Sequence, residues 1–163
     1  MSREKFFNGA CENLIKILFV CHGNICRSPM AEFIMKYLVK ESGNEEKFFI
    51  SSAATTNDDI GSDTYSNAKK ELIKHNIPFE SRHARKIKRA EYSQWDYIIG
   101  MDNENIEDIL YIMGGDKDNK VKLLLDFTGK NKEVSDPWYT RNFEIAYSEI
   151  YRGCEALLKF LNS

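Results

Sequence analysis

The sequence predicts an α/β fold: a single domain of three layers, with a central four-stranded parallel sheet and helices on both faces. Short apolar runs of strand length alternate with longer segments whose apolar residues recur every three or four positions. Strands that alternate with helices favour a parallel sheet that is covered on both sides. The length of 163 residues fits one domain with a sizeable core, and no internal repeat or interdomain linker divides the sequence.

The first predicted unit is a strand, a loop and a helix. Residues 16–21 form an apolar run typical of a buried strand, and residues 22–24 are turn-prone. Ser28 and Pro29 are predicted to begin the helix, Ser28 as its N-cap and Pro29 as its first residue. Apolar residues then recur on one helical face, until residues 42–44 end the helix; they are Met30, Phe33, Ile34, Tyr37 and Leu38.

The later elements continue the alternation. Strands are predicted at residues 47–52, 95–100 and 121–125. Helices are predicted at residues 64–75, 103–113 and 142–161, and Asp102 is expected to cap the second of them. Residues 53–63 are expected to form a loop, and residues 127–140 a long irregular segment. The expected core contacts of the last helix are Phe143, Ala146, Ile150, Leu157, Leu158 and Leu161.

The composition restricts the classes of function. Apolar residues make up 42% of the chain and charged residues 29%, which is typical of a soluble globular protein. The net charge of -2 excludes a broad basic surface, so we expect no nucleic-acid partner. No apolar run approaches the roughly 20 residues that cross a bilayer, so we expect no membrane partner. Residues 1–13 are expected to be an N-terminal extension rather than a signal peptide, the domain to span residues 14–163, and the compartment to be the cytoplasm.

The loop from Cys21 to Ser28 has the character of an anion site. The first amides of a helix lack partners within it, and the helix dipole adds partial positive charge there. Successive backbone N–H groups can surround phosphate oxygens, and Gly23 allows the backbone to turn inward. Arg27 adds a planar fork that can bind two oxygens. We therefore expect phosphate or sulfate to bind in this loop, at the carboxyl end of the first strand.

Cys21 lies at the base of this loop, where the field that binds phosphate also favours a thiolate. The sequence thus predicts that Cys21 attacks phosphorus and forms a phosphocysteine, which water then hydrolyses. Ser28 is expected to donate its hydroxyl to the sulfur, and Asn24 to hold the loop. Asp136, oriented by Pro137, is the candidate general acid and base. Trp138 and Tyr139 would wall the pocket with aromatic surface, which favours aryl phosphates such as phosphotyrosine.

Residues 20–32, together with the late Asp136-Pro137-Trp138-Tyr139, resemble the low-molecular-weight protein tyrosine phosphatases. The resemblance covers nearly the whole chain. It implies hydrolysis of phosphotyrosine in proteins, or of small aryl phosphates, without a metal or an organic cofactor. It also implies that Cys21 is the nucleophile, Arg27 the phosphate clamp and Asp136 the acid. The remaining phosphate-binding and supporting residues are then His22, Gly23, Asn24, Ile25, Cys26 and Ser28.

The sequence departs from the family pattern at a few positions. His22 stands where an apolar residue or Thr is more frequent, and Arg82 where many members carry His. Thr140 follows the aromatic pair where Gly is common. Asp58 falls where many members place an aromatic residue beside the substrate ring. The expected substrate rim is therefore Asp58, Trp138 and Tyr139, and its acidic side is expected to disfavour acidic peptides.

The cysteines are expected to be free thiols. By the resemblance, mild peroxide should link Cys21 to Cys26 and protect Cys21 from further oxidation, which peptide mapping would detect. Cys11 and Cys154 are expected to be inert. Cys21, His22 and Cys26 are not accompanied by a second ligand pair at zinc-like spacing, so we expect no metal site.

Two other functions fit parts of the same pattern. A thiol-dependent arsenate reductase can share this fold and loop, but its reaction uses further cysteines in a mobile segment after the middle of the chain. No cysteine lies between Cys26 and Cys154, and Asp136-Pro137 is present, so both features favour the phosphatase. A catalytically silent phosphoprotein-binding module would be expected to lose the nucleophile or the acid, and both are kept. The physiological substrate stays open between phosphotyrosine, phosphoarginine and other phosphomonoesters.

Overall fold

The computed structural model describes residues 14–163; the predicted extension over residues 1–13, including Cys11, lies outside them. All strand pairs are parallel, and the order across the sheet is β2-β1-β3-β4. The strands are β1 (Ile15–Cys21), β2 (Phe48–Ala54), β3 (Tyr97–Gly100) and β4 (Val121–Leu123). The four-stranded parallel sheet expected from the sequence is thus confirmed.

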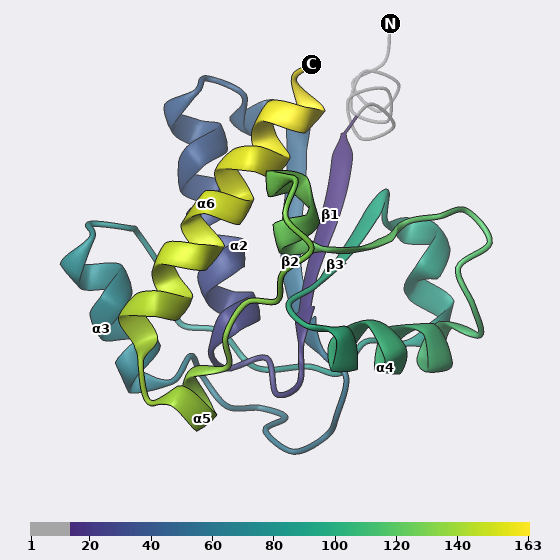
Figure 1. Ribbon diagram of the computed structural model, residues 1–163, viewed down its shortest axis with the longest axis horizontal. Coiled ribbons are helices and arrows are strands. Elements are labelled where there is room, and N and C mark those ends of the chain that lie inside the picture. Colours follow the sequence, from purple (N-terminus) through teal and green to yellow (C-terminus); the bar gives the residue numbers. More distant parts are fainter. Residues whose placement is uncertain (1–13) are drawn as a thin grey trace, which may run out of the picture.

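Helices cover both faces of this sheet, as Figure 1 shows. One face carries α2 (Arg27–Glu41), α3 (Ser66–Lys74) and α6 (Phe143–Leu161), and the other carries α4 (Asn103–Met113). The short elements are η1 (Glu45–Lys47), η2 (Arg89–Gln94), η3 (Leu124–Thr128) and α5 (Pro137–Thr140). No helix in the described range is both long enough and apolar enough to span a membrane.

The central strand β1 divides the core in two because successive side chains of a strand point to opposite faces. Ile17 and Phe19 pack in the cluster formed with α2 and α6. Leu18 and Val20 pack in the second cluster, which includes Ile109 of α4. All of these side chains are fully buried. The continuous apolar run over residues 17–20 is therefore what a sheet covered on both faces requires.

The helix after β1 begins differently from the prediction. It starts at Arg27, and Cys26 occupies the N-cap position without a capping side-chain hydrogen bond. The prediction that Ser28 caps this helix is therefore wrong: Ser28 lies inside the first turn, and its hydroxyl contacts the sulfur of Cys21. Pro29 still fits because the first turn of a helix needs few backbone donors.

Other predicted elements differ mainly in their ends. The fourth strand ends at Leu123 rather than at residue 125, because Leu124 and Leu125 turn into η3 and pack into the core. The predicted irregular segment contains η3 and α5. Asp102 caps α4 as expected, since its side chain accepts a hydrogen bond from the Asn105 amide. Of the expected contacts of α6, Ala146, Ile150 and Leu157 are fully buried, and the others pack partly buried against the core: Phe143, Leu158 and Leu161.

Candidate functional site

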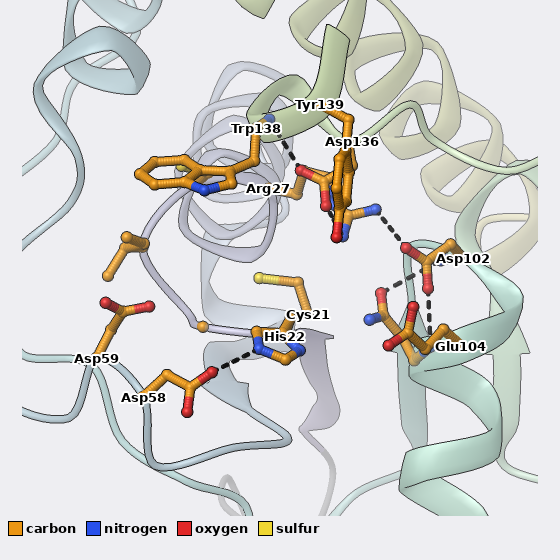
Figure 2. A pocket seen from close by; sticks show the side chains of 14 residues that line it. Cys21, His22, Arg27, Asp58, Asp59, Asp102, Glu104, Asp136, Trp138 and Tyr139 are labelled. Atoms are coloured by element: carbon orange, nitrogen blue, oxygen red, sulfur yellow. Dashed lines mark hydrogen bonds and ion pairs between the residues drawn. The ribbon is translucent and has the colours of Figure 1, made fainter. Parts of the chain in front are cut away.

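A cavity of about 410 Å³ lies over the loop that joins β1 to α2. Segments distant in the sequence line this cavity, and Figure 2 shows their side chains around it. They are the β1–α2 loop with Cys21, the loop after β2 with Asp58, the start of α4 with Glu104, and α5 with Trp138. The carboxyl ends of β1, β2 and β3 meet here, as expected for ligand sites in parallel sheets.

Cys21 ends β1 and is 4% exposed at the floor of the cavity. Its Sγ lies 3.1 Å from the Ser28 Oγ. Asn24, which is fully buried, donates from Nδ2 to the same Ser28 oxygen over 2.8 Å. Its Oδ1 accepts from the Arg85 amide over 3.2 Å and from the Arg82 guanidinium. Because Ser28 accepts from Asn24, the Ser28 hydrogen is free to point at the sulfur of Cys21.

Arg27 is almost completely buried, and its guanidinium is held on two sides. Nη1 donates to Asp102 Oδ2 over 2.7 Å and to the Val134 carbonyl over 3.2 Å. Nη2 lies 3.4 Å from Asp136 Oδ2. Burial lowers the pKa of Arg27, but the negative groups Cys21, Asp102 and Asp136 raise it by more, so the net shift is upward. Arg27 is therefore a permanently charged, oriented group at the wall of the cavity.

Asp136 and the two aromatic residues after it form the wall opposite the loop. Asp136 Oδ1 accepts from the Trp138 amide over 3.0 Å, which makes Asp136 the cap of α5. Pro137 is buried in the first position of α5 and fixes where this short helix begins. Trp138 is 55% exposed and Tyr139 is 85% exposed. In Figure 2 both aromatic side chains lie on the side of the cavity that carries Asp136.

His22 and two aspartates form the other side of the opening. His22 Nε2 lies 2.7 Å from Asp58 Oδ2, and both side chains are exposed (Figure 2). Asp58 thus lines the opening of the cavity and is paired with His22, the histidine that departs from the family pattern. A Cβ at Gly23 would meet the carboxylate of Asp59, a flexible side chain that would have to shift to make room for it. Ile25 also lines the cavity.

Cys26 is the second thiol of the loop. Burial is the main cause that raises the pKa of Cys26 to about 12, and the negative Cys21 and Asp136 add to it. Cys26 is therefore protonated at neutral pH, unlike a group prepared for attack. Cys21, Cys26 and Cys154 are all free thiols in the structure, so the peroxide-induced link between Cys21 and Cys26 stays a prediction. Within residues 14–163 no group of His, Cys, Asp and Glu has the arrangement of a metal site.

Several cavity residues were not predicted as site residues. Asp102 was expected only to cap α4, yet its second carboxylate oxygen also holds Arg27. Asp59, Glu104 and Asn105 line the cavity as well. Asp102 follows β3, which neighbours β1 in the sheet. Its position just beyond the carboxyl end of a parallel strand is the sequence signal that could have identified Asp102 as a site residue.

A thiol at the base of a strand–loop–helix turn, with an arginine and a carboxylate lining the same cavity, is typical of a phosphatase. The sequence model of the low molecular weight phosphotyrosine protein phosphatases matches residues 16–163. The chain therefore belongs to the low molecular weight protein tyrosine phosphatase family, and it is a hydrolase of that class.

Individual relatives agree with this assignment. The low molecular weight protein-tyrosine-phosphatase YfkJ of Bacillus subtilis is 39% identical over 147 residues, which are 89% of this chain and 94% of YfkJ. PtpA of Staphylococcus aureus is 34% identical over 91% of this chain and 94% of its own length. The crystal structure of YfkJ superposes with a TM-score of 0.88 at 38% identity, over 91% of this chain and 95% of YfkJ. Vibrio vulnificus Wzb, solved in complex with benzylphosphonate, gives a TM-score of 0.79 at 26% identity, over 90% and 99% of the two chains.

Proposed function

We propose that this phosphatase hydrolyses phosphotyrosine and related aryl phosphates through a phosphocysteine intermediate. In this mechanism Cys21 is the nucleophile, Arg27 the phosphate clamp and Asp136 the general acid and base. The observation that carries the proposal is that these side chains, from two distant segments, face one cavity over the anion-binding loop (Figure 2).

In the first step the Cys21 thiolate attacks phosphorus, an S–P bond forms, and the bond from phosphorus to the phenolic oxygen breaks. Asp136 gives its proton to that oxygen, so the product leaves as a neutral phenol. The loop amides and Arg27 bind the remaining phosphate oxygens. Asp136 lies close enough to Arg27, at 3.4 Å, to reach a leaving group bound beside the clamp.

In the second step water attacks the phosphocysteine. The Asp136 carboxylate, deprotonated by the first step, accepts a proton from the water as the new P–O bond forms. The S–P bond breaks, the thiolate of Cys21 returns and inorganic phosphate leaves. The Ser28 hydroxyl, 3.1 Å from the sulfur, stabilises the departing thiolate by a charge-assisted hydrogen bond.

The preference for an aromatic substrate rests on Trp138 and Tyr139. Their exposed side chains stand beside the cavity and offer a flat apolar surface to a substrate ring. Benzylphosphonate, the ligand of the Wzb relative, likewise joins an aromatic ring to a phosphorus oxyanion. Turnover of a phosphoarginine peptide, measured beside a phosphotyrosine peptide, tests the alternative substrate class.

The test compares wild type, Cys21→Ser and Asp136→Ala on two substrates, phenyl phosphate and 2,4-dinitrophenyl phosphate. Cys21→Ser should bind phosphate but not turn over, and substantial residual turnover would exclude the mechanism. General acid catalysis contributes about 100- to 10,000-fold. Asp136→Ala should therefore lose about 100-fold or more in kcat/KM with phenyl phosphate, whose leaving group needs a proton, and much less with the dinitrophenyl ester. Equal losses would exclude Asp136 as the acid.

A further inference from the structure

We propose that Glu149 is a positioning residue that fixes Asp136 for proton transfer, an inference that rests on the function proposed above for Asp136. Glu149 lies on α6, and only 3% of it is exposed. Its Oε1 accepts from the Ser135 amide over 3.0 Å and from the Ser135 hydroxyl over 2.7 Å. Its Oε2 lies 2.8 Å from the ammonium of Lys132. Both carboxylate oxygens therefore bind the segment that leads into α5.

A buried carboxylate is costly unless donors and an opposite charge surround it. Burial raises the pKa of Glu149, but hydrogen bonds from Lys132 and Ser135 lower it by more, so the net shift is downward. Glu149 thus stays ionised although its side chain is buried. Two donors of one residue, Ser135, converge on one oxygen, which fixes both the backbone and the side chain of Ser135.

Ser135 directly precedes Asp136, so its placement determines where the Asp136 backbone starts. The preceding residue, Val134, is held independently: its amide donates to the Met101 carbonyl over 2.8 Å, and its carbonyl accepts from Arg27 over 3.2 Å. The Asp136 side chain is 29% exposed, and its nearest cation is 3.4 Å away. The other carboxylate oxygen accepts from the Trp138 amide of α5, so the side chain follows the backbone of the segment that enters α5. The Glu149–Ser135 contact is the last fixed point before Asp136.

The arrangement places the anchor on a rigid element outside the cavity. α6 runs beside the segment that precedes α5 (Figure 1), and Glu149 is not among the residues that line the cavity. Glu149 thus does not face the substrate, and it acts on the reaction through the segment that carries Ser135 and Asp136. A displacement of about 1 Å at a reacting group can cost about 100-fold in rate. Loss of the anchor should therefore weaken acid catalysis without weakening phosphate binding.

The experiment measures kcat/KM for phenyl phosphate and 2,4-dinitrophenyl phosphate in Glu149→Met and Glu149→Gln. This parameter covers the steps through release of the phenol, in which Asp136 acts as the acid. Glu149→Met keeps the apolar packing but removes the acceptor, and should lose about tenfold or more with phenyl phosphate and at most about threefold with the dinitrophenyl ester. Glu149→Gln keeps an acceptor oxygen for Ser135 and should stay within about threefold of wild type on both substrates. The inhibition constant of inorganic phosphate should not change.

Two controls separate positioning from a general loss of structure. Glu155→Met makes the same change at an exposed position of the same helix and should behave like wild type. Ser135→Ala removes one of the two donors and should give a smaller loss of the same kind; this variant also decides the question if Glu149→Met does not fold. In the Asp136→Ala background, Glu149→Met should add no further loss with phenyl phosphate, since residues that act through one group are not additive.

Equal losses on the two substrates in Glu149→Met, a further loss in the double variant, or unchanged kinetics in both Glu149→Met and Ser135→Ala would overturn the proposal. Its failure can be distinguished from failure of the proposed function. If Asp136→Ala depends on the leaving group and Glu149→Met does not, only the role of Glu149 is lost. If Asp136→Ala itself shows no such dependence, the role of Asp136 is lost first.

Discussion

Asn24 combines an unusual backbone conformation with a side chain that several groups share. Its φ is +59°, in the left-handed region that asparagine tolerates better than most residues. Its Nδ2 donates to Ser28 Oγ over 2.8 Å and to Ser52 Oγ over 3.0 Å, while Oδ1 accepts from Arg82 and Arg85. The side-chain amide of Asn24 has an oxygen that only accepts and a nitrogen that only donates. Because the two arginines donate to the oxygen, the nitrogen must face Ser28. Ser28 therefore accepts from Asn24, and its own hydrogen is left for Cys21.

The two properties of Asn24 can be separated by substitution. Asn24→Ala and Asn24→Gly both lose the side-chain hydrogen bonds, but only alanine adds the left-handed penalty of about 1–2 kcal/mol. Glycine loses about 0.5–1 kcal/mol through the entropy of the unfolded chain. Both variants should be less stable than wild type, with the glycine variant the more stable of the two by roughly 0.5–1 kcal/mol. Urea unfolding measures the difference; an alanine variant as stable as the glycine variant would show that φ at this position is not strained.

At the scale of the elements, the sequence predicted what short-range patterns encode. The apolar run before Cys21, the turn residues after it and the cap at Asp102 are local signals, and each appears in the structure. The end of the fourth strand is not encoded locally. The apolar residues Leu124 and Leu125 predict a longer strand, but they form part of η3 and are buried against α6. Strand and 3₁₀ turn share the same apolar residues here, so tertiary packing decides between them.

The candidate site shows the same division. Cys21, Arg27 and Asp136 were predicted because a motif and a turn mark them, and the structure brings them to one cavity. The local contact between Ser28 and Cys21 was predicted, but the long-range contacts were not: Arg27 meets Asp102 across 75 positions in sequence. Glu149 binds Ser135, but in the sequence it cannot be distinguished from the other charged residues of an amphipathic helix. Its burial depends on how α6 packs, which no local sequence pattern predicts.

The packing of α6 against η3 depends on a residue without a side chain. Gly153 lies in α6, and a Cβ there would come within 2.5 Å of the Cγ of the fully buried Leu124. Alanine has a better helix propensity than glycine by about 1 kcal/mol. Overpacking a core typically costs about 1–3 kcal/mol, which is larger. We therefore expect Gly153→Ala to lower the free energy of unfolding by roughly 1–2 kcal/mol, as measured by urea denaturation.

A second background tests the cause of this effect. Leu124→Ala removes the atoms that an added Cβ would meet, at the cost of a cavity. In that background Gly153→Ala should become neutral or stabilising, because only the gain in helix propensity remains. The same destabilisation by Gly153→Ala in both backgrounds would show that contact with Leu124 is not the reason for the glycine.

At the scale of the whole molecule, buried thiol and phenol groups make the free energy of unfolding depend on pH in the alkaline range. Burial, helped by nearby negative charge, raises the pKa of Cys26 from 9.0 to about 12. Burial likewise raises the pKa of Tyr147 from 10.0 to about 12, and it raises that of Cys154 in the middle of α6. Each group holds its proton more tightly in the folded protein than in the unfolded chain. Their contribution to stability is complete below the unfolded pKa values and is lost as the pH rises from about 9 towards about 12.

The free energy of unfolding, measured with urea in the presence of a reductant, should therefore be level in the region of pH 8 and fall above about pH 9. Each group contributes a slope of at most about 1.4 kcal/mol per pH unit. Lysines also titrate in this range, so wild type is compared with Cys26→Ala and Cys154→Ala. The packing lost in these variants lowers the free energy of unfolding by an amount that does not vary with pH. The difference in slope then isolates each thiol, and both variants should fall less steeply than wild type. Parallel curves for wild type and both variants would contradict this expectation, because they would mean that the thiols ionise as easily in the folded protein as in the unfolded chain. The burial of Cys26 beside Cys21 and of Cys154 within α6 should prevent such easy ionisation.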